Sequence, residues 1–172
     1  MARPRHTLFL FGLAAVLLIL TLPIRPAQAA PTPISFGATM AGSISTQGEQ
    51  DAFTFMAATG DVVVIRLTTE SDFWPEITLY DPSGSPLASS LEVGPTLVEI
   101  KEEQLPADGY YQVTVSDYNG TGTGTYWIFV QRLNNPGGAA QVEFGETLSA
   151  AITSTCQEHT YRFEAFQGTP FR

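Results

Sequence analysis

The chain contains few side chains that could act as a nucleophile, a general base or a zinc ligand. The segment Cys156-Gln-Glu-His159 places a thiol and an imidazole within three residues of each other. Zinc requires a third and a fourth ligand, and a hydrolase triad requires a rigid pocket around its histidine. Nothing else in the sequence supplies those ligands, so we interpret this segment as the entry of a strand. We expect no catalytic residue, no metal-binding residue and no enzymatic activity.

Carboxylates are the second candidate group, because glycoside hydrolysis uses two of them facing each other across a cleft. Glu102 and Glu103 are adjacent, so on a strand their side chains would point to opposite faces. We therefore interpret them as solvated residues of a sheet edge.

Calcium binding is the alternative role for the acidic residues. No Asp-x-Asp-x-Asp-Gly loop occurs in the sequence. We therefore expect no cofactor, and calcium remains an alternative with four candidate ligands: Asp51, Asp72, Asp81 and Asp117. Asp51 opens an expected strand, where its favoured role is to accept backbone N–H bonds from the neighbouring turn.

Aromatic side chains are the candidates for ligand binding. Both alternating faces of the segment 126–130 are apolar, whereas only one face of a strand can pack on the core. Either Trp127 and Phe129 line an outer surface that stacks on a sugar or peptide, or they form the core set while Tyr126 and Ile128 meet a neighbouring domain. Packing in the core or against a domain is the favoured interpretation. The candidate ligand-binding residues are Trp74, Tyr118, Trp127 and Phe129.

The elements that must position these residues are strands, because apolar and polar residues alternate with a period of two, as where Phe53 and Phe55 flank Thr54. The continuous β-branched run 62–67 is typical of a central strand covered on both faces. The segment 81–84, Asp-Pro-Ser-Gly, has the residues of a type I turn. We expect an all-β fold, an antiparallel jelly-roll-like β-sandwich of about eight strands. These strands are expected near 39–45, 51–57, 61–69, 75–81, 86–91, 96–103, 109–116 and 124–131.

The sequence also repeats itself. The segment 34–40, Ile-Ser-Phe-Gly-Ala-Thr-Met, returns as 142–148, Val-Glu-Phe-Gly-Glu-Thr-Leu, so that Phe36 and Phe144 are 108 residues apart. A period this long indicates tandem domains, since solenoid repeats are much shorter.

Proline and paired glycines separate the two copies, so regular structure is expected to stop between them. We expect a domain over 31–133, a linker over 134–141 and the start of a second, truncated copy over 142–172.

The first residues indicate export. Arg3 and Arg5 precede the uncharged apolar run 7–24, and Ala27-Gln-Ala29 follows it, which is the pattern of a signal peptide. We expect a signal-peptide helix over residues 1–29 that is cleaved after Ala29, with a retained membrane anchor as the alternative. The protein is then secreted, either extracellular or held at the cell surface.

The charge of the mature chain excludes two classes of partner. Cleavage removes Arg3, Arg5 and Arg25, which leaves five basic residues against 17 acidic ones and a net charge of −12. Neutralising phosphates requires clustered Lys and Arg, and the remaining basic residues are scattered. We expect no nucleic acid partner and no membrane contact after cleavage.

Several motifs occur in a characteristic order. Gln50-Asp-Ala-Phe-Thr-Phe55 is followed by Ala58-Thr-Gly-Asp61 and by Ile77-Thr-Leu-Tyr-Asp-Pro-Ser-Gly84, and Leu105-Pro-Ala-Asp-Gly-Tyr-Tyr-Gln-Val113 precedes Gly124-Thr-Tyr126. This order resembles the bacterial pre-peptidase C-terminal domain family. The resemblance implies a β-sandwich of the kind appended to secreted proteases and other exported enzymes. Two positions depart from the family pattern: the segment 87–92 lacks its acidic, glycine-rich character, and His159 stands where the first copy has Asp51.

We therefore expect a non-catalytic accessory module that serves adhesion, spacing or substrate presentation beside an exported enzyme such as a peptidase. Its expected partners are an extracellular polymer, either protein or polysaccharide, or an adjoining catalytic domain. The alternatives are a module that binds a carbohydrate or protein polymer and a structural repeat of a cell-envelope protein.

Overall fold

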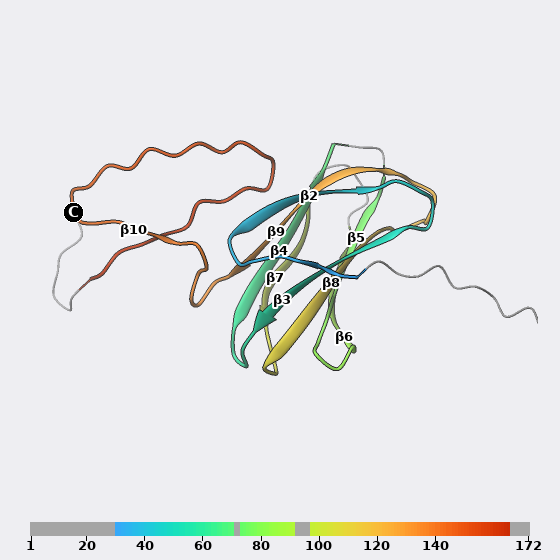
Figure 1. Ribbon diagram of the computed structural model, residues 1–172, viewed down its shortest axis with the longest axis horizontal. Coiled ribbons are helices and arrows are strands. Elements are labelled where there is room, and N and C mark those ends of the chain that lie inside the picture. Colours follow the sequence, from blue (N-terminus) through green and yellow to red (C-terminus); the bar gives the residue numbers. More distant parts are fainter. Residues whose placement is uncertain (1–29, 71–72, 92–96, 166–172) are drawn as a thin grey trace, which may run out of the picture.

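The structure is a computed structural model that describes residues 30–70, 73–91 and 97–165. Two sheets lie face to face and form a sandwich (Figure 1). The five-stranded sheet has the order β1-β3-β8-β5-β6 and the four-stranded sheet the order β2-β9-β4-β7. The strands of the first sheet are β1 (Thr32–Pro33), β3 (Gln50–Ala57), β8 (Gly109–Asp117), β5 (Pro75–Tyr80) and β6 (Pro86–Leu91). Those of the second are β2 (Ala38–Ile44), β9 (Gly124–Arg132), β4 (Val62–Thr69) and β7 (Leu97–Gln104).

The predicted all-β sandwich is confirmed, and the eight strands expected from the alternation correspond to β2 through β9. One strand of the sandwich was not predicted: β1 is only two residues long and pairs in parallel with β3, so that Thr32 lies opposite Phe53. Two residues are too few for a periodic pattern to show. The signal-peptide helix expected over 1–29 lies outside the described residues. Among the residues that the structure describes, no helical segment has the length and hydropathy of a membrane span.

The core lies between the sheets and consists of the inward-facing residue of each alternating pair. Phe53 and Phe55 of β3, Ile77 and Leu79 of β5, and Val113 of β8 are all buried in it. Each such side chain contributes about 1.5–3 kcal/mol when it is removed from water. As expected, β4 is an interior strand, between β9 and β7.

Turns with defined hydrogen bonds join these strands. The predicted turn at 81–84 is present, with the Gly84 N–H donating to the Asp81 carbonyl at 2.9 Å. The Tyr111 hydroxyl donates to the Ala107 carbonyl at 2.8 Å and so fixes the chain before β8.

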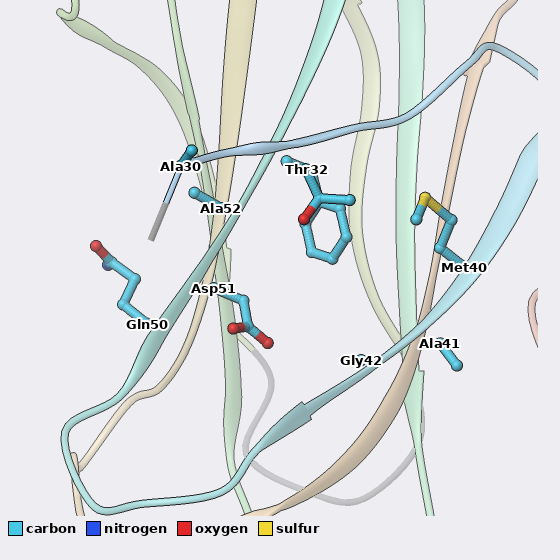
Figure 2. A pocket seen from close by; sticks show the side chains of 9 residues that line it. Ala30, Thr32, Met40, Ala41, Gly42, Gln50, Asp51 and Ala52 are labelled. Carbon is cyan, nitrogen blue, oxygen red and sulfur yellow. The ribbon is translucent and has the colours of Figure 1, made fainter. Parts of the chain in front are cut away.

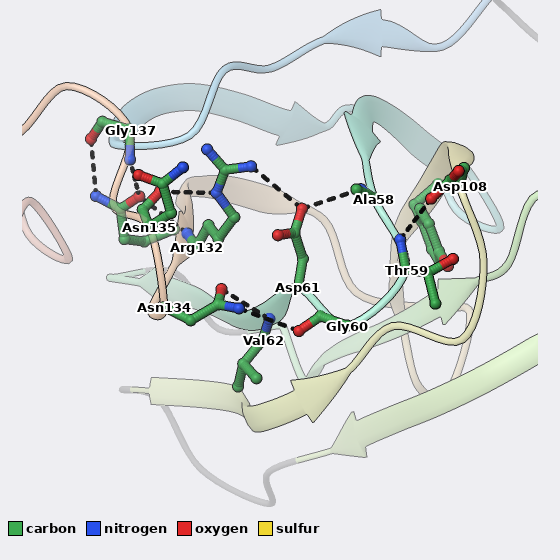
Figure 3. A network of polar contacts seen from close by, with 12 residues as sticks. Ala58, Thr59, Gly60, Asp61, Val62, Asp108, Arg132, Asn134, Asn135 and Gly137 are labelled. Atoms are coloured by element: carbon green, nitrogen blue, oxygen red, sulfur yellow. Dashed lines mark hydrogen bonds and ion pairs between the residues drawn. The ribbon is translucent and has the colours of Figure 1, made fainter.

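The segment after β9 is irregular but closely held to the sandwich (Figure 3). Asn134 Oδ1 accepts from the Val62 N–H at 3.1 Å, and its Nδ2 donates to the Gly60 carbonyl at 3.0 Å. Arg132 donates from Nε to the Asn135 carbonyl at 2.7 Å and pairs with Asp61 at 3.2 Å. Regular structure therefore stops after β9, and side-chain hydrogen bonds hold the backbone of the segment that follows in place.

Residues 140–165, which we call the C-terminal unit, contain a small parallel sheet of β10 (Ala140–Gln141) and β11 (Tyr161–Arg162). Its pairing repeats that of β1 and β3: Ala140 lies opposite Tyr161 as Thr32 lies opposite Phe53, each residue shifted by 108 positions. In Figure 1 this unit, coloured orange to red, extends to one side of the sandwich.

The turns of the C-terminal unit follow the same offset. Gln157 Oε1 accepts from the Thr153 N–H at 2.7 Å, as Glu49 Oε2 accepts from the Ser45 N–H at 2.6 Å. The rings of Phe144 and Phe163 lie 6.0 Å apart, and those of Phe36 and Phe55 lie 5.3 Å apart. The equivalent sequences therefore adopt equivalent local structures.

Candidate functional site

Asp117 ends β8, and its carboxylate accepts hydrogen bonds from the loop that follows and from the residue before β5. The backbone N–H of Trp74 donates to Oδ1 at 2.8 Å, and those of Thr121 and Gly122 donate to Oδ2 at 2.9 Å. Burial raises the pKa of Asp117, but the donors, led by Gly122, outweigh burial and hold that pKa below its ordinary value. Asp117 thus stabilises its loop as an ionised acceptor.

Asp81 plays a similar local part in the turn between β5 and β6. Its Oδ1 accepts from the Ser83 hydroxyl at 2.6 Å and from the Ser83 and Ser85 N–H groups at 2.8 and 2.9 Å. The Ser83 hydroxyl, followed by the Ser85 N–H, lowers the pKa of Asp81. The carboxylate is therefore occupied by its own turn.

Asp51 corrects our sequence-based expectation. The neighbouring turn is bound by Glu49, whose Oε2 accepts from the N–H groups of Ser45 and Thr46, while Asp51 Oδ2 accepts from the Tyr126 hydroxyl at 2.5 Å. The reason is strand parity: Asp51 has the same parity as the buried Phe53, so its side chain points toward the other sheet.

A small cavity of about 160 Å³ lies beside Asp51, between β1, β2 and β3 (Figure 2). The Asp51 carboxylate points across it toward Gly42, and Met40 and Thr32 line it further along. Small-molecule sites typically have roughly 300–1,000 Å³, so this cavity is too small for a sugar ring.

The candidate calcium ligands are not brought together. Asp51, Asp81 and Asp117 lie on β3, after β5 and at the end of β8 respectively, and each binds different partners. Asp72 lies outside the described residues. Across the described part of the chain, no group of three or more His, Cys, Asp or Glu side chains could hold a metal ion.

Cys156 and His159 occupy the C-terminal unit and bind separate partners. The His159 Nε2 lies 2.9 Å from the Ala151 carbonyl, which corresponds to a turn contact. Cys156 is half-buried against Thr68 of β4, and burial raises the pKa of its thiol. A thiol whose pKa is raised is a poor nucleophile at neutral pH.

Two of the candidate aromatic residues lie together. The Tyr118 N–H donates to the Trp74 carbonyl at 2.8 Å, which continues the pairing of β8 with β5 beyond its end. Both side chains are exposed, 41% for Trp74 and 52% for Tyr118.

The other two lie on the outer face of the four-stranded sheet. Trp127 is 37% exposed, whereas Phe129 is completely buried, so the expectation that Phe129 contacts a ligand is corrected. Tyr126 and Ile128 form the core set.

A shallow groove that sequence analysis did not identify crosses the outer face of the five-stranded sheet. Its volume is about 430 Å³, and its floor consists of Thr54, Gln112 and Thr114, with Tyr80 and Tyr110 beside them. Thr54, Gln112 and Tyr80 are register partners on β3, β8 and β5 and form one row across the sheet. The alternation of β8 carried the signal, because its outward positions are Tyr110, Gln112 and Thr114.

Hydroxyl and amide groups are frequent in the groove, and the strands of its sheet contribute no basic side chain. None of the five strands of its sheet contains Lys or Arg. Among the described residues, Arg66, Lys101 and Arg132 belong to the four-stranded sheet and Arg162 to β11. The surface therefore suits an uncharged, hydroxyl-rich ligand better than an anionic one.

The comparisons with known proteins concern the fold. No protein-family model matches the sequence, and no curated protein matches it. The structure is similar to the pre-peptidase C-terminal domain of collagenase from Bacillus anthracis, with a TM-score of 0.52 and 23% identity over 62% of this chain and 98% of that domain.

Two weaker similarities are to PliG, a periplasmic inhibitor of g-type lysozyme. The Aeromonas hydrophila protein gives a TM-score of 0.43 with 16% identity over 59% of this chain and 96% of its own. The Salmonella Typhimurium protein gives 0.44 with 19% identity over 60% of this chain and 98% of its own. The fold of this chain is thus similar to that of a pre-peptidase C-terminal domain.

Proposed function

We propose that this chain is an exported, non-catalytic accessory module that positions a neighbouring part of the same protein beside an extracellular polymer. One observation carries the proposal: the described carboxylates that the sequence offered as candidate ligands are bound into turns or into the contact between the sheets. Asp117, Asp81 and Asp51 are examples, each held by donors of its own surroundings. A general acid or base must exchange a proton with a bound substrate. These carboxylates already accept hydrogen bonds from groups of the protein itself.

Export is part of the proposal and is supported by the sequence pattern of residues 1–29. Expression of the chain with its own leader in a bacterial host, followed by N-terminal sequencing, tests it. We expect a mature product that begins at Ala30, outside the cytoplasm. A product that keeps Met1 and stays in the cytoplasm would contradict export.

The absence of catalysis is tested with the purified full chain. The chain is incubated with panels of peptides and neutral and acidic glycans, and released products are detected by mass spectrometry. We expect no product above the level given by the heat-unfolded chain. Product that increases with protein concentration and disappears in Cys156→Ala or His159→Ala would overturn the proposal.

A second candidate function is favoured by the groove on the five-stranded sheet. Tyrosine rings beside amide and hydroxyl groups suit a neutral polysaccharide, because the rings stack on sugars while the polar groups exchange hydrogen bonds with hydroxyls. A volume of about 430 Å³ also lies within the range of ligand sites.

Affinity electrophoresis in gels that contain dextran, xylan or hydroxyethyl cellulose tests this function. We expect retardation by at least one neutral polymer and a loss of about fivefold to tenfold in affinity for Tyr110→Ala, in line with an aromatic contact. Tyr118→Ala is the matched control, since Tyr118 is exposed at the end of the same sheet and lies outside the groove. Equal loss in both variants, or no retardation by any of the polymers, would exclude the groove as the site.

A further inference from the structure

The outer face of the four-stranded sheet is partly covered, although it points away from the core. Along β9 and β4, the core residues alternate with outward-facing ones, which include Trp127, Phe129, Gln131, Val64, Arg66 and Thr68. Phe129 and Val64 are 0% and 3% exposed, yet neither belongs to the core cluster. The outward-facing side chains of a two-layer sandwich usually contact solvent, so the burial of two apolar side chains here indicates that a further chain segment lies over them.

That segment comes from the C-terminal unit. The hydroxyls of Thr68 and Thr155 are 2.7 Å apart, and the Gln131 Nε2 donates to the Thr160 Oγ1 at 3.1 Å. Cys156 also contacts Thr68. The segment 153–160 therefore lies over the row that contains Phe129.

Charges reinforce the contact. The Arg66 guanidinium pairs with Glu158 of the C-terminal unit and, at 2.5 Å through Nε, with Glu99 of the neighbouring strand β7. Lys101 lies 3.4 Å from the other oxygen of Glu99. The chain has few basic residues. Two of them, Arg66 and Lys101, thus belong to one charge cluster that joins this sheet to the C-terminal unit.

The connecting segment is held in the same place. The Gln131 side chain forms a double hydrogen bond with Gly137, donating to its carbonyl and accepting from its N–H, both at 3.0 Å. A Cβ added to Gly137 would lie 2.5 Å from the Cβ of Phe36, so the connection passes directly against the sandwich.

The first copy lacks the side chains that make these contacts, although it contains the same turn. The positions 108 residues before Thr155, Glu158 and Thr160 hold Gln47, Gln50 and Ala52, whose side chains differ in charge and hydrogen-bonding groups. The backbone turn is repeated, while the residues that touch the sheet are particular to the C-terminal unit.

We infer that the outer face of the β2-β9-β4-β7 sheet is a docking surface for the C-terminal unit, which holds two successive β-domains in one fixed orientation. This inference rests on the proposed role as a positioning module, because it treats the C-terminal unit as the opening of a second domain. Its occupant is the segment 153–160, which is held on the surface by an ion pair and two hydrogen bonds and lies over Phe129. The module then acts as a rigid spacer.

Disulfide trapping in the full chain tests this contact. In Thr68→Cys, the new thiol faces Cys156, and oxidised glutathione takes up the two electrons as the two thiols join. Ser89→Cys is the control, because Ser89 is exposed on β6 of the other sheet. Peptide mapping without reduction is expected to find the 68–156 link in most of the first variant and no 89–156 link in the second. Absence of the 68–156 link, or equal linkage in both folded variants, would overturn the docking surface.

A second measurement uses the native cysteine. We expect Thr155→Val, which removes the hydrogen bond to Thr68 without changing charge, to raise the reactivity of Cys156 toward a disulfide reagent about two- to tenfold. Thr147→Val is the matched control in the same unit and is expected to leave the rate unchanged. Equal rates in the wild type, Thr155→Val and the unfolded chain would contradict the contact.

The outcomes separate this inference from the proposed function. Turnover of a substrate by a chain that still forms the 68–156 link would remove the proposed function and keep the docking surface. A chain without turnover and without the link would keep the non-catalytic module and remove its rigid joint.

Discussion

The Tyr126 hydroxyl donates a hydrogen bond of 2.5 Å to Asp51 Oδ2 and thereby joins the two sheets of the sandwich. Tyr126 belongs to β9 and Asp51 to β3, so the bond crosses the interior. The Tyr126 ring is completely buried and lies edge-on to Phe53, with ring centroids 6.3 Å apart. This polar contact therefore links the two sheets within the apolar layer.

The first prediction concerns alkaline pH. Burial, followed by the hydrogen bond to Asp51, raises the pKa of Tyr126 above its ordinary value. The folded chain keeps this proton while the unfolded chain loses it above about pH 10, so the free energy of unfolding falls there by about 1.4 kcal/mol per pH unit for this group. Denaturant titrations from pH 8 to 11 should show a smaller decline for Tyr126→Phe than for the wild type. Parallel curves would contradict the assignment.

Gly42 gives the second prediction, because it lies opposite Tyr126 in the pairing of β2 with β9. A Cβ at this position would lie 2.3 Å from the ring, so Gly42→Ala must displace Tyr126. We expect a loss of about 1–3 kcal/mol in the free energy of unfolding, as for other overpacked sites. Ser43→Ala, one residue along the same strand and exposed, is the control. Thermal or urea denaturation measures both.

The third prediction concerns acid. The pKa of Asp117 is held below its ordinary value, so its contribution to stability is complete above the unfolded value of about 4 and is lost as the pH falls through the folded pKa. Asp117→Asn is expected to cost about 1–3 kcal/mol at pH 7, because an amide group then faces the N–H donors of Trp74 and Gly122. The unfolding curves of the variant and the wild type should converge as the pH falls through the folded pKa of Asp117. Glu102→Gln, at an exposed site, should match the wild type throughout.

Gln131 carries the fourth prediction. Its side chain is 2% exposed and bonds to Gly137 and Thr160, so Gln131→Ala leaves partly buried polar groups without this partner. We expect faster cleavage by proteases within 133–139 and a loss of about 1–3 kcal/mol. Gln47→Ala, on an exposed turn, is the control. Unchanged cleavage of the Gln131 variant would show that other contacts hold this segment.

The sequence was sufficient for the strands because their alternation is regular. Phe53 and Phe55 around Thr54 are typical, since burial of one face dictates the period of two. The two-residue β1 lacked any such pattern. The turn at Asp81 was equally predictable, because its backbone and side-chain hydrogen bonds both join residues within the turn.

The candidate site was harder to predict because it depends on neighbours distant in the sequence. Phe129 faces outward, as one interpretation of 126–130 required, yet a segment about 25 residues further along covers it. Asp51 has the parity of Phe53, but its partner Tyr126 is 75 residues away. The groove beside Tyr110 exists only because three strands from separate regions become neighbours.

The central claim is that this protein binds an extracellular polymer and does not cleave it. Co-sedimentation of the purified chain with insoluble neutral polysaccharide, with product analysis of the same supernatant, tests this claim. The account predicts that the chain leaves the supernatant, that Tyr110→Ala remains in it, and that no soluble saccharide or peptide appears. Soluble products released in proportion to the amount of folded chain would contradict it.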